Sequence, residues 1–153
     1  MEKIMTMEEL ERRVKMLEDM EEIKALHREY LFWISGLEIE KALDCFARDI
    51  EVEVANYGTR RGKEEVAEFF RETIYKNVLQ SKDGHFTGQP VVVVKHGKAN
   101  GHWMFYRFLN DPSRRWIQGR YDCEYSKEDG KWKFSVLKMR RPWPKFLADT
   151  AKD

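Results

Sequence analysis

Residues 121–139, YDCEYSKEDGKWKFSVLKM, contain two runs of alternating apolar and polar residues separated by Asp129-Gly130. Such alternation is typical of a strand with one buried face, because successive side chains of a strand point to opposite sides. An Asp-Gly pair between two such runs favours a tight two-residue turn, in which both residues need a positive φ. The segment therefore predicts an antiparallel hairpin.

The same pattern extends toward the N-terminus of this hairpin. β-Branched and aromatic residues are concentrated after His85, and turn-forming residues divide them into separate runs. We expect four strands, at Val91–Lys95, Ala99–Leu109, Trp116–Ser126 and Lys131–Met139. Short connections between alternating strands predict an antiparallel meander. An earlier alternating run, Ile50–Ala55, predicts one further half-buried strand.

The first half of the chain has helical periodicity. Thr6 and Glu9 can form a capping box, and apolar residues then recur every three or four positions. We expect a long helix from Met7 to Ile34. Two shorter helices are expected at Ile39–Ala47 and at Glu64–Val78.

The apolar stripe of the long helix is narrow before Met20 and resembles the seam of a coiled coil. We therefore expect these turns to extend past the domain and to pack on another subunit. Residues 1–8 and 146–153 are expected to be peripheral tails of one domain that spans residues 1–153.

Helices that precede a series of strands are typical of an α+β fold. With 153 residues, 42% of them hydrophobic, the chain is sized for one domain with a substantial core. We expect three N-terminal helices packed on one face of a curved, mainly antiparallel sheet.

The charges and cysteines exclude several functional classes. Lys and Arg total 28 and Asp and Glu total 27, so no overall field attracts nucleic acid or an anionic membrane. The basic residues from Lys131 to Lys145 are interpreted as a solvated strand face and tail. Cys45 and Cys123 lack CxxC spacing and are expected to be reduced thiols. Without a signal-peptide pattern or a run of roughly 20 apolar residues, a soluble cytoplasmic protein is expected.

Most aromatic residues of the expected sheet are interpreted as ordinary core. If the sheet is curved like a cone, side chains cannot fill its concave face completely, and an apolar pocket suited to a flat cyclic ligand is expected there. Arg107, Arg120 and Arg141 are candidate anchors for a carboxylate or a phenolate in that pocket. We expect at least one of the three to turn inward.

Two segments carry a resemblance to a known family. They are Gly62-Lys63-Glu64-Glu65-Val66, at the start of the third expected helix, and Asp129-Gly130-Lys131-Trp132-Lys133-Phe134, at the last hairpin. With the order of elements over nearly the whole chain, they resemble the SnoaL-like branch of the NTF2-like superfamily. The pattern is nearest to scytalone dehydratase, bile-acid dehydratase and the hexachlorocyclohexane dehydrochlorinase.

This resemblance implies a cone-shaped α+β barrel that eliminates water or HCl without a cofactor. It also implies a homo-oligomer, with a trimer favoured and a dimer possible. NTF2-like cones serve in addition as cyclases, isomerases and binding domains, so the fold alone does not imply the chemistry.

The resemblance also implies roles for particular residues. Tyr30 and His85 match the catalytic tyrosine and histidine of these enzymes, and Arg141 and Tyr121 match residues of their pockets. Three positions depart from the pattern: Ser35 or Gly36 replaces the aspartate that orients the histidine, Val54 replaces a tyrosine and Trp103 replaces a second histidine. The expected substrate-binding residues are Arg141, Tyr121, Trp103, Val54, Ser35 and Tyr57.

An imidazole can accept and return a proton near neutral pH, which suits elimination. In the implied mechanism His85 removes a proton α to a carbonyl of a small cyclic or polycyclic compound. Tyr30 donates a hydrogen bond to the carbonyl oxygen, and Asp122 or Glu53 could replace the absent aspartate. Two alternatives stay open: a non-catalytic small-molecule-binding or assembly domain, and an isomerase or cyclase that uses the same base.

The other histidines have simpler interpretations. His27, three residues before Tyr30, is expected on a neighbouring helix face with a surface or interface role. His96 is expected in an exposed turn, and His102 is expected to point out of the sheet. The histidines and cysteines lack metal-ligand spacing, and no phosphate-binding loop or dinucleotide motif is present. We therefore expect no metal and no nucleotide or redox cofactor.

Overall fold

A computed structural model of the chain describes residues 4–81, 84–112 and 114–140. Its helices are α1 (Met7–Ser35), α2 (Ile39–Asp44), α3 (Lys63–Phe69) and α4 (Tyr75–Ser81). Its strands are β1 (Phe46–Val54), β2 (Thr59–Arg61), β3 (Gly84–Lys95), β4 (Lys98–Phe108), β5 (Trp116–Glu128) and β6 (Lys131–Arg140). The strands form one sheet in the order β2-β1-β6-β5-β4-β3. Neighbouring strands are antiparallel except β1 and β6, which are parallel.

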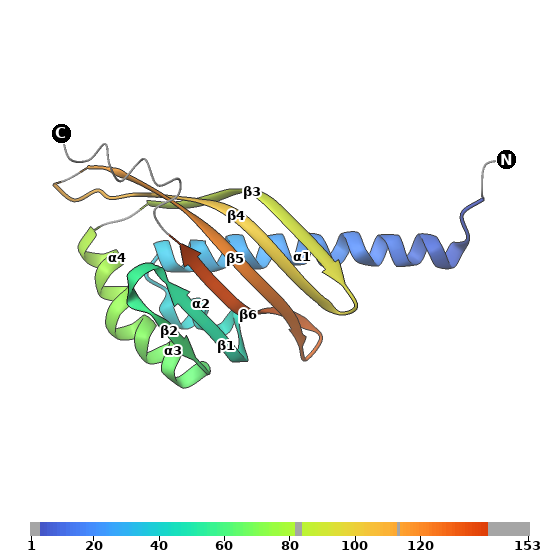
Figure 1. The fold of residues 1–153 in the computed structure, drawn as a ribbon, viewed down its shortest axis with the longest axis horizontal. Coiled ribbons are helices and arrows are strands. Elements are labelled where there is room, and N and C mark those ends of the chain that lie inside the picture. Colours follow the sequence, from blue (N-terminus) through green and yellow to red (C-terminus); the bar gives the residue numbers. More distant parts are fainter. Residues whose placement is uncertain (1–3, 82–83, 113, 141–153) are drawn as a thin grey trace.

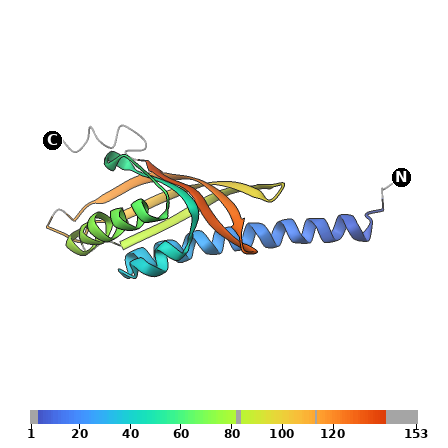
Figure 2. The same cartoon turned by 90° about the horizontal axis from the view of Figure 1, so that it is seen from below.

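The helices lie on one side of the sheet, which curves around them without closing (Figures 1 and 2). Helix α1 contacts β3 and β6, and α3 contacts β1. The α+β class, with helices on one face of a curved and mainly antiparallel sheet, is therefore confirmed. The third expected helix is divided, because a π-helical turn at Phe70–Ile74 separates α3 from α4.

The last hairpin has the expected geometry. Asp129 and Gly130 have φ angles of 53° and 76°, and Glu128 pairs with Lys131 across the turn. The predicted capping box of α1 is also present, with the Glu9 amide donating to Thr6 Oγ1 and the Thr6 amide donating to the Glu9 carboxylate. Local signals in the sequence thus place both elements correctly.

The second expected helix ends earlier than its periodicity predicts. It stops at Asp44, and Phe46 and Ala47 begin β1 instead. The reason is tertiary: Phe46 is fully buried and pairs with Phe134 in the parallel ladder between β1 and β6. The helical spacing of neighbouring residues cannot reveal a pairing with Phe134, because Phe134 is so distant in the sequence.

The N-terminal half of α1 extends beyond the sheet (Figures 1 and 2). Its apolar residues Leu10, Val14 and Leu17 are exposed. At about 100° per residue, Val14 lies on the face opposite the buried Ile23, so this stripe does not continue the core face. That this part of α1 packs on another subunit stays a prediction.

No helix among the described residues is long and apolar enough to cross a membrane.

His27 lies at the centre of the core, so the expectation of a surface or interface role is wrong. Its ring is fully buried and stacks on Trp103, with 4.2 Å between the ring centroids. The physical reason is that Ile23, His27, Tyr30 and Ile34 share one helix face, and the sheet covers all of it.

Hydrogen bonds join the His27 ring to two residues of the sheet. The Trp103 indole N–H donates to the Tyr125 hydroxyl at 3.1 Å, and that hydroxyl lies 3.2 Å from His27 Nδ1. The Tyr125 oxygen has two lone pairs, so beside the Trp103 N–H it can accept from Nδ1–H or donate its own proton to Nδ1. Nε2 has no hydrogen-bond partner among the described residues. Burial lowers the pKa of His27 to about 3.

We expect the buried neutral His27 to make folding sensitive to acid. Between pH 6.5 and about 3 the unfolded chain binds a proton at this residue and the folded chain does not. Stability should therefore fall as the pH falls, by at most about 1.4 kcal/mol per pH unit from this group. Urea denaturation at pH 7 and pH 4.5 should show a loss that is roughly 2 kcal/mol smaller in His27→Phe than in the wild type.

His96→Asn is the matched control, since His96 lies exposed in a turn with a φ of 51° that asparagine tolerates. This control should keep the acid sensitivity of the wild type. An equal loss of stability in His27→Phe and the wild type would contradict the attribution of this acid sensitivity to His27.

Candidate active site

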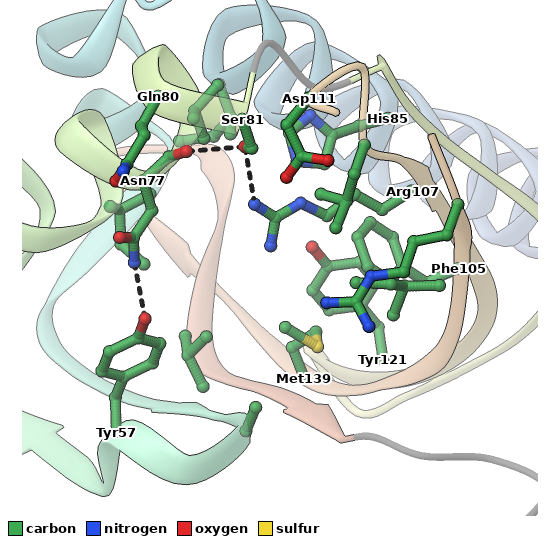
Figure 3. A pocket seen from close by; sticks show the side chains of 18 of the residues that line it. Tyr57, Asn77, Gln80, Ser81, His85, Phe105, Arg107, Asp111, Tyr121 and Met139 are labelled. Atoms are coloured by element: carbon green, nitrogen blue, oxygen red, sulfur yellow. Dashed lines mark hydrogen bonds between the residues drawn. The ribbon is translucent and has the colours of Figure 1, made fainter. Parts of the chain in front are cut away.

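A pocket of about 470 Å³ lies between α1, α4 and the concave face of the sheet (Figure 3). Its lining combines apolar and polar side chains. The apolar lining includes Ile34, Val54, Phe105, Ile117, Leu137 and Met139. The polar lining includes Tyr57, Asn77, Gln80, Ser81, Asp111 and Arg115. Such a mixed lining suits a ring system that carries a few polar groups.

Tyr30 and His85 both line this pocket. Tyr30 comes from the last turns of α1 and His85 from the start of β3, so two elements far apart in the sequence bring them to one cavity. A ligand in this pocket could therefore contact both residues.

Tyr30 is held in an aromatic cage. Its ring lies 5.5 Å from that of Phe46, 5.4 Å from that of Phe134 and 6.4 Å from that of Phe70. Burial raises the pKa of Tyr30 well above its ordinary value, with Tyr121 adding to the effect. The hydroxyl therefore stays protonated and can donate a hydrogen bond to a ligand.

His85 is oriented from two sides. Its Nδ1 lies 3.0 Å from Ser35 Oγ, and its ring stacks on that of Phe105 with 5.9 Å between centroids. Ser35 is the last residue of α1 and stands where the resemblance places an aspartate. A hydroxyl can either donate or accept, so Ser35 holds the ring in place while allowing both neutral tautomers, whereas an aspartate would favour only Nδ1–H.

Of the two candidate anchors that the structure describes, Arg107 turns inward. It lines the pocket and lies directly opposite His85 in the ladder between β3 and β4. Arg120 instead lies on the other face of the sheet, where its Nη2 is 3.0 Å from Asp122. Arg141 lies outside the described residues.

The remaining expected site residues fall into two groups. Val54, Tyr121 and Tyr57 line the pocket, and the Tyr57 hydroxyl accepts a hydrogen bond from Asn77 Nδ2 at 2.7 Å. Trp103 packs in the core against His27 and is not part of the lining among the described residues, because α1 covers this end of the sheet.

The two carboxylates considered as partners for His85 lie on the outer face of the sheet. Asp122 binds His102 Nδ1 at 2.6 Å, and Glu53 lies 3.9 Å from Arg140. His102 is exposed there, as its position in the alternating strand predicts. Strand alternation therefore separates Asp122 and Glu53 from the pocket.

Several polar lining residues were missed by sequence reasoning. Asn77, Gln80 and Ser81 come from the end of α4, and Asp111 and Arg115 from the connection between β4 and β5. No local sequence pattern identifies these residues as part of a pocket. Arg107 did have a signal, because it shares the parity of Trp103 and Phe105 in one strand.

The cysteines take no part in this arrangement. Cys45 and Cys123 are free and buried. Burial raises the pKa of Cys45 to about 12 and raises that of Cys123 as well, so neither forms a thiolate near neutral pH. Within the described part of the chain, no three His, Cys, Asp or Glu residues cluster so as to hold a metal ion.

Comparison with known proteins identifies the fold. The SnoaL-like domain family matches residues 15–138. A crystal structure of an NTF2-like protein with a cystatin-like fold from Novosphingobium aromaticivorans is similar with a TM-score of 0.80 and 18% identity, over 99% of each chain. No curated protein sequence matches the chain.

Two further structures illustrate the range of related proteins. The hexachlorocyclohexane dehydrochlorinase LinA-type3 from Novosphingobium barchaimii has a TM-score of 0.69 and 23% identity, over 81% of this chain and 86% of that one. An NTF2-like protein of unknown function from Pseudomonas putida has a TM-score of 0.72 and 16% identity, over 83% and 89%. At such identities the similarity is one of fold.

We expect removal of the Ser35 hydroxyl to change the tautomer of His85 with little effect on folding. In Ser35→Ala the nitrogen-15 spectrum of the His85 ring should show an altered tautomer ratio. The free energy of unfolding should fall by less than about 1 kcal/mol, because the hydroxyl is only half-buried. Ser35→Asp should give the Nδ1–H form as the only neutral tautomer.

Ser126→Ala, a change of the same size outside the pocket lining, should leave the His85 spectrum as in the wild type. If Ser35→Ala also left it unchanged, Ser35 would not be an orienting partner.

Proposed function

Because this chain belongs to the SnoaL-like family, we propose that it is a cofactor-independent lyase that removes water from a small cyclic or polycyclic carbonyl compound. The observation that carries the proposal is that Tyr30 and His85 line one pocket together with apolar side chains. A base and a hydrogen-bond donor that act on one ligand are the minimum for removing a proton α to a carbonyl.

The proposed reaction has two steps. In the first, His85 takes a proton from the carbon next to the carbonyl. The electron pair of that C–H bond forms the carbon–carbon double bond of an enolate, and the π pair of the carbonyl moves to the oxygen. Tyr30 donates a hydrogen bond to this oxygen as negative charge develops on it. In the second, the enolate re-forms the carbonyl, a carbon–carbon double bond forms, and the β-hydroxyl leaves with the proton from His85 as water.

The surroundings of Tyr30 favour its role as donor. The hydroxyl stays neutral because burial raises its pKa, and phenylalanine rings pack around the Tyr30 ring. A hydrogen bond to a developing oxyanion is stronger in such a place than in water. One donor of this kind typically contributes a factor of about 10² to 10³ in rate.

The surroundings of His85 favour its role as base. Its Nδ1 faces Ser35, and the other ring nitrogen carries the lone pair when Nδ1–H donates to the Ser35 hydroxyl. That tautomer has its basic nitrogen on the side of the ring away from α1. Phe105 supports one face of the ring and limits its rotation.

The comparisons add support of a general kind. One protein of similar fold is a dehydrochlorinase by name, which is an elimination enzyme. Others of the same fold have unknown function, so the reaction proposed here is based on the pocket of this chain.

We expect the protein to dehydrate 4-hydroxy-2-tetralone, a bicyclic β-hydroxyketone whose elimination product is the fluorescent 2-naphthol. In His85→Asn the kcat should fall by about 10² to 10⁴, because the base is lost. Thermal stability should change little, since His85 is only half-buried. His96→Asn, at an exposed turn, should keep the activity of the wild type.

Tyr30→Phe should lower kcat with this probe by about 10- to 10³-fold and change KM less, because the hydrogen bond strengthens only as the enolate forms. Fluorescence assays at saturating probe would measure the difference. Equal kcat values for Tyr30→Phe and the wild type would exclude the hydroxyl from the reaction.

The same probe in D₂O separates the alternatives. Deuterium uptake next to the carbonyl without loss of water would point to an isomerase or cyclase that shares the base. Tight binding of the probe with neither exchange nor elimination would point to a binding domain.

A further inference from the structure

Arg107 and His85 form a cross-strand pair whose side chains both enter the pocket. They lie directly opposite each other in the ladder of β3 and β4. Residues opposite each other in an antiparallel pair have their Cβ atoms about 5 Å apart on the same face. A ligand group that binds Arg107 is therefore held beside the ring proposed to act as the base.

The guanidinium of Arg107 is positioned by a short chain of hydrogen bonds (Figure 3). Its Nη2 donates to Ser81 Oγ at 3.1 Å, and the Ser81 hydroxyl donates to the Asn77 carbonyl at 2.6 Å. Because the only hydroxyl proton of Ser81 goes to Asn77, its oxygen is available to accept from Arg107. The end of α4 thus fixes one edge of a planar fork of donors inside the pocket.

The charge of the pocket differs from that of the whole chain. The overall net charge is only +1, but the described lining contains two arginines, Arg107 and Arg115, and one acidic residue, Asp111. Arg115 is tied to the end of β4, because its carbonyl accepts a hydrogen bond from the Leu109 amide at 2.9 Å. Both arginines therefore line the same pocket.

We propose that Arg107, assisted by Arg115, forms a carboxylate-binding subsite beside His85, so that the substrate is a cyclic keto acid. The inference rests on the proposed function only for the keto group. The subsite itself stands on the placement of Arg107. A guanidinium matches a carboxylate with two parallel hydrogen bonds, and the ring system of the same ligand can contact apolar lining residues such as Phe105 and Met139.

The test compares two ligands of nearly equal shape, 2-naphthoate and 2-naphthamide, which differ in charge. Isothermal titration calorimetry at pH 7 should show that the wild type binds the carboxylate at least about tenfold more tightly than the amide. In Arg107→Gln the affinity for 2-naphthoate should fall by about tenfold, and that for 2-naphthamide by less than about twofold. Arg107→Lys should keep part of the preference, because it retains the charge without the planar fork.

Arg48→Gln is the control, since Arg48 is 79% exposed outside the pocket lining and its loss removes the same charge. It should bind both probes like the wild type. Equal affinity of the wild type for the two probes, or no binding of 2-naphthoate at millimolar concentration, would overturn the proposal. So would an unchanged preference in a folded Arg107→Gln.

These measurements are independent of turnover. If 2-naphthoate is preferred but 4-hydroxy-2-tetralone is not dehydrated, the subsite stands and the lyase reaction fails. If the neutral tetralone is dehydrated but the two naphthalene probes bind equally, the reaction stands and the subsite fails.

Discussion

The stacking of His27 on Trp103 determines where α1 lies across the sheet, and the pocket depends on that placement. The two rings are 4.2 Å apart and nearly parallel, and both are joined to Tyr125 by hydrogen bonds. Tyr30 follows one helical turn after His27, and Ser35 ends the same helix. A shift of α1 along the sheet would therefore move the donor and the partner of His85 together.

Glycine makes this contact possible. A Cβ atom on Gly101 would lie 3.1 Å from the Tyr125 ring and 3.2 Å from the Trp103 indole nitrogen. The small residue allows Tyr125 to lie under β4 and to join the two rings. On the other side of the pocket, the register of β3 and β4 places Arg107 beside His85. Helix placement and strand register together assemble groups from α1, α4 and the sheet.

Much of the fold could be predicted from local signals. The capping box at Thr6 and the turn at Asp129-Gly130 depend on residues next to each other in the chain, and both are present. The end of α2 could not be predicted, because Phe46 is drawn into β1 by its pairing with Phe134. His27 was misplaced because its spacing from Tyr30 was taken to put it on a neighbouring helix face, whereas both residues are buried and Tyr125 contacts one ring nitrogen of His27.

The site was predictable to the same limited extent. Family resemblance paired Tyr30 with His85, and both line one pocket. The contact of Ser35 with His85 and the support of Arg107 by Ser81 depend on tertiary packing and have no local pattern. Trp103, which the resemblance places in the pocket, lies in the core instead, where its indole N–H donates to the Tyr125 hydroxyl. This placement also depends on tertiary packing.

The central claim is that Tyr30 and His85 act on one ligand in one pocket. A crystal structure of the protein with 2-naphthol bound tests it most directly. We predict that the naphthol oxygen accepts a hydrogen bond from the Tyr30 hydroxyl and that a ring carbon next to it faces Nε2 of His85. A naphthol bound outside this pocket, or inside it with its oxygen away from Tyr30, would contradict the account.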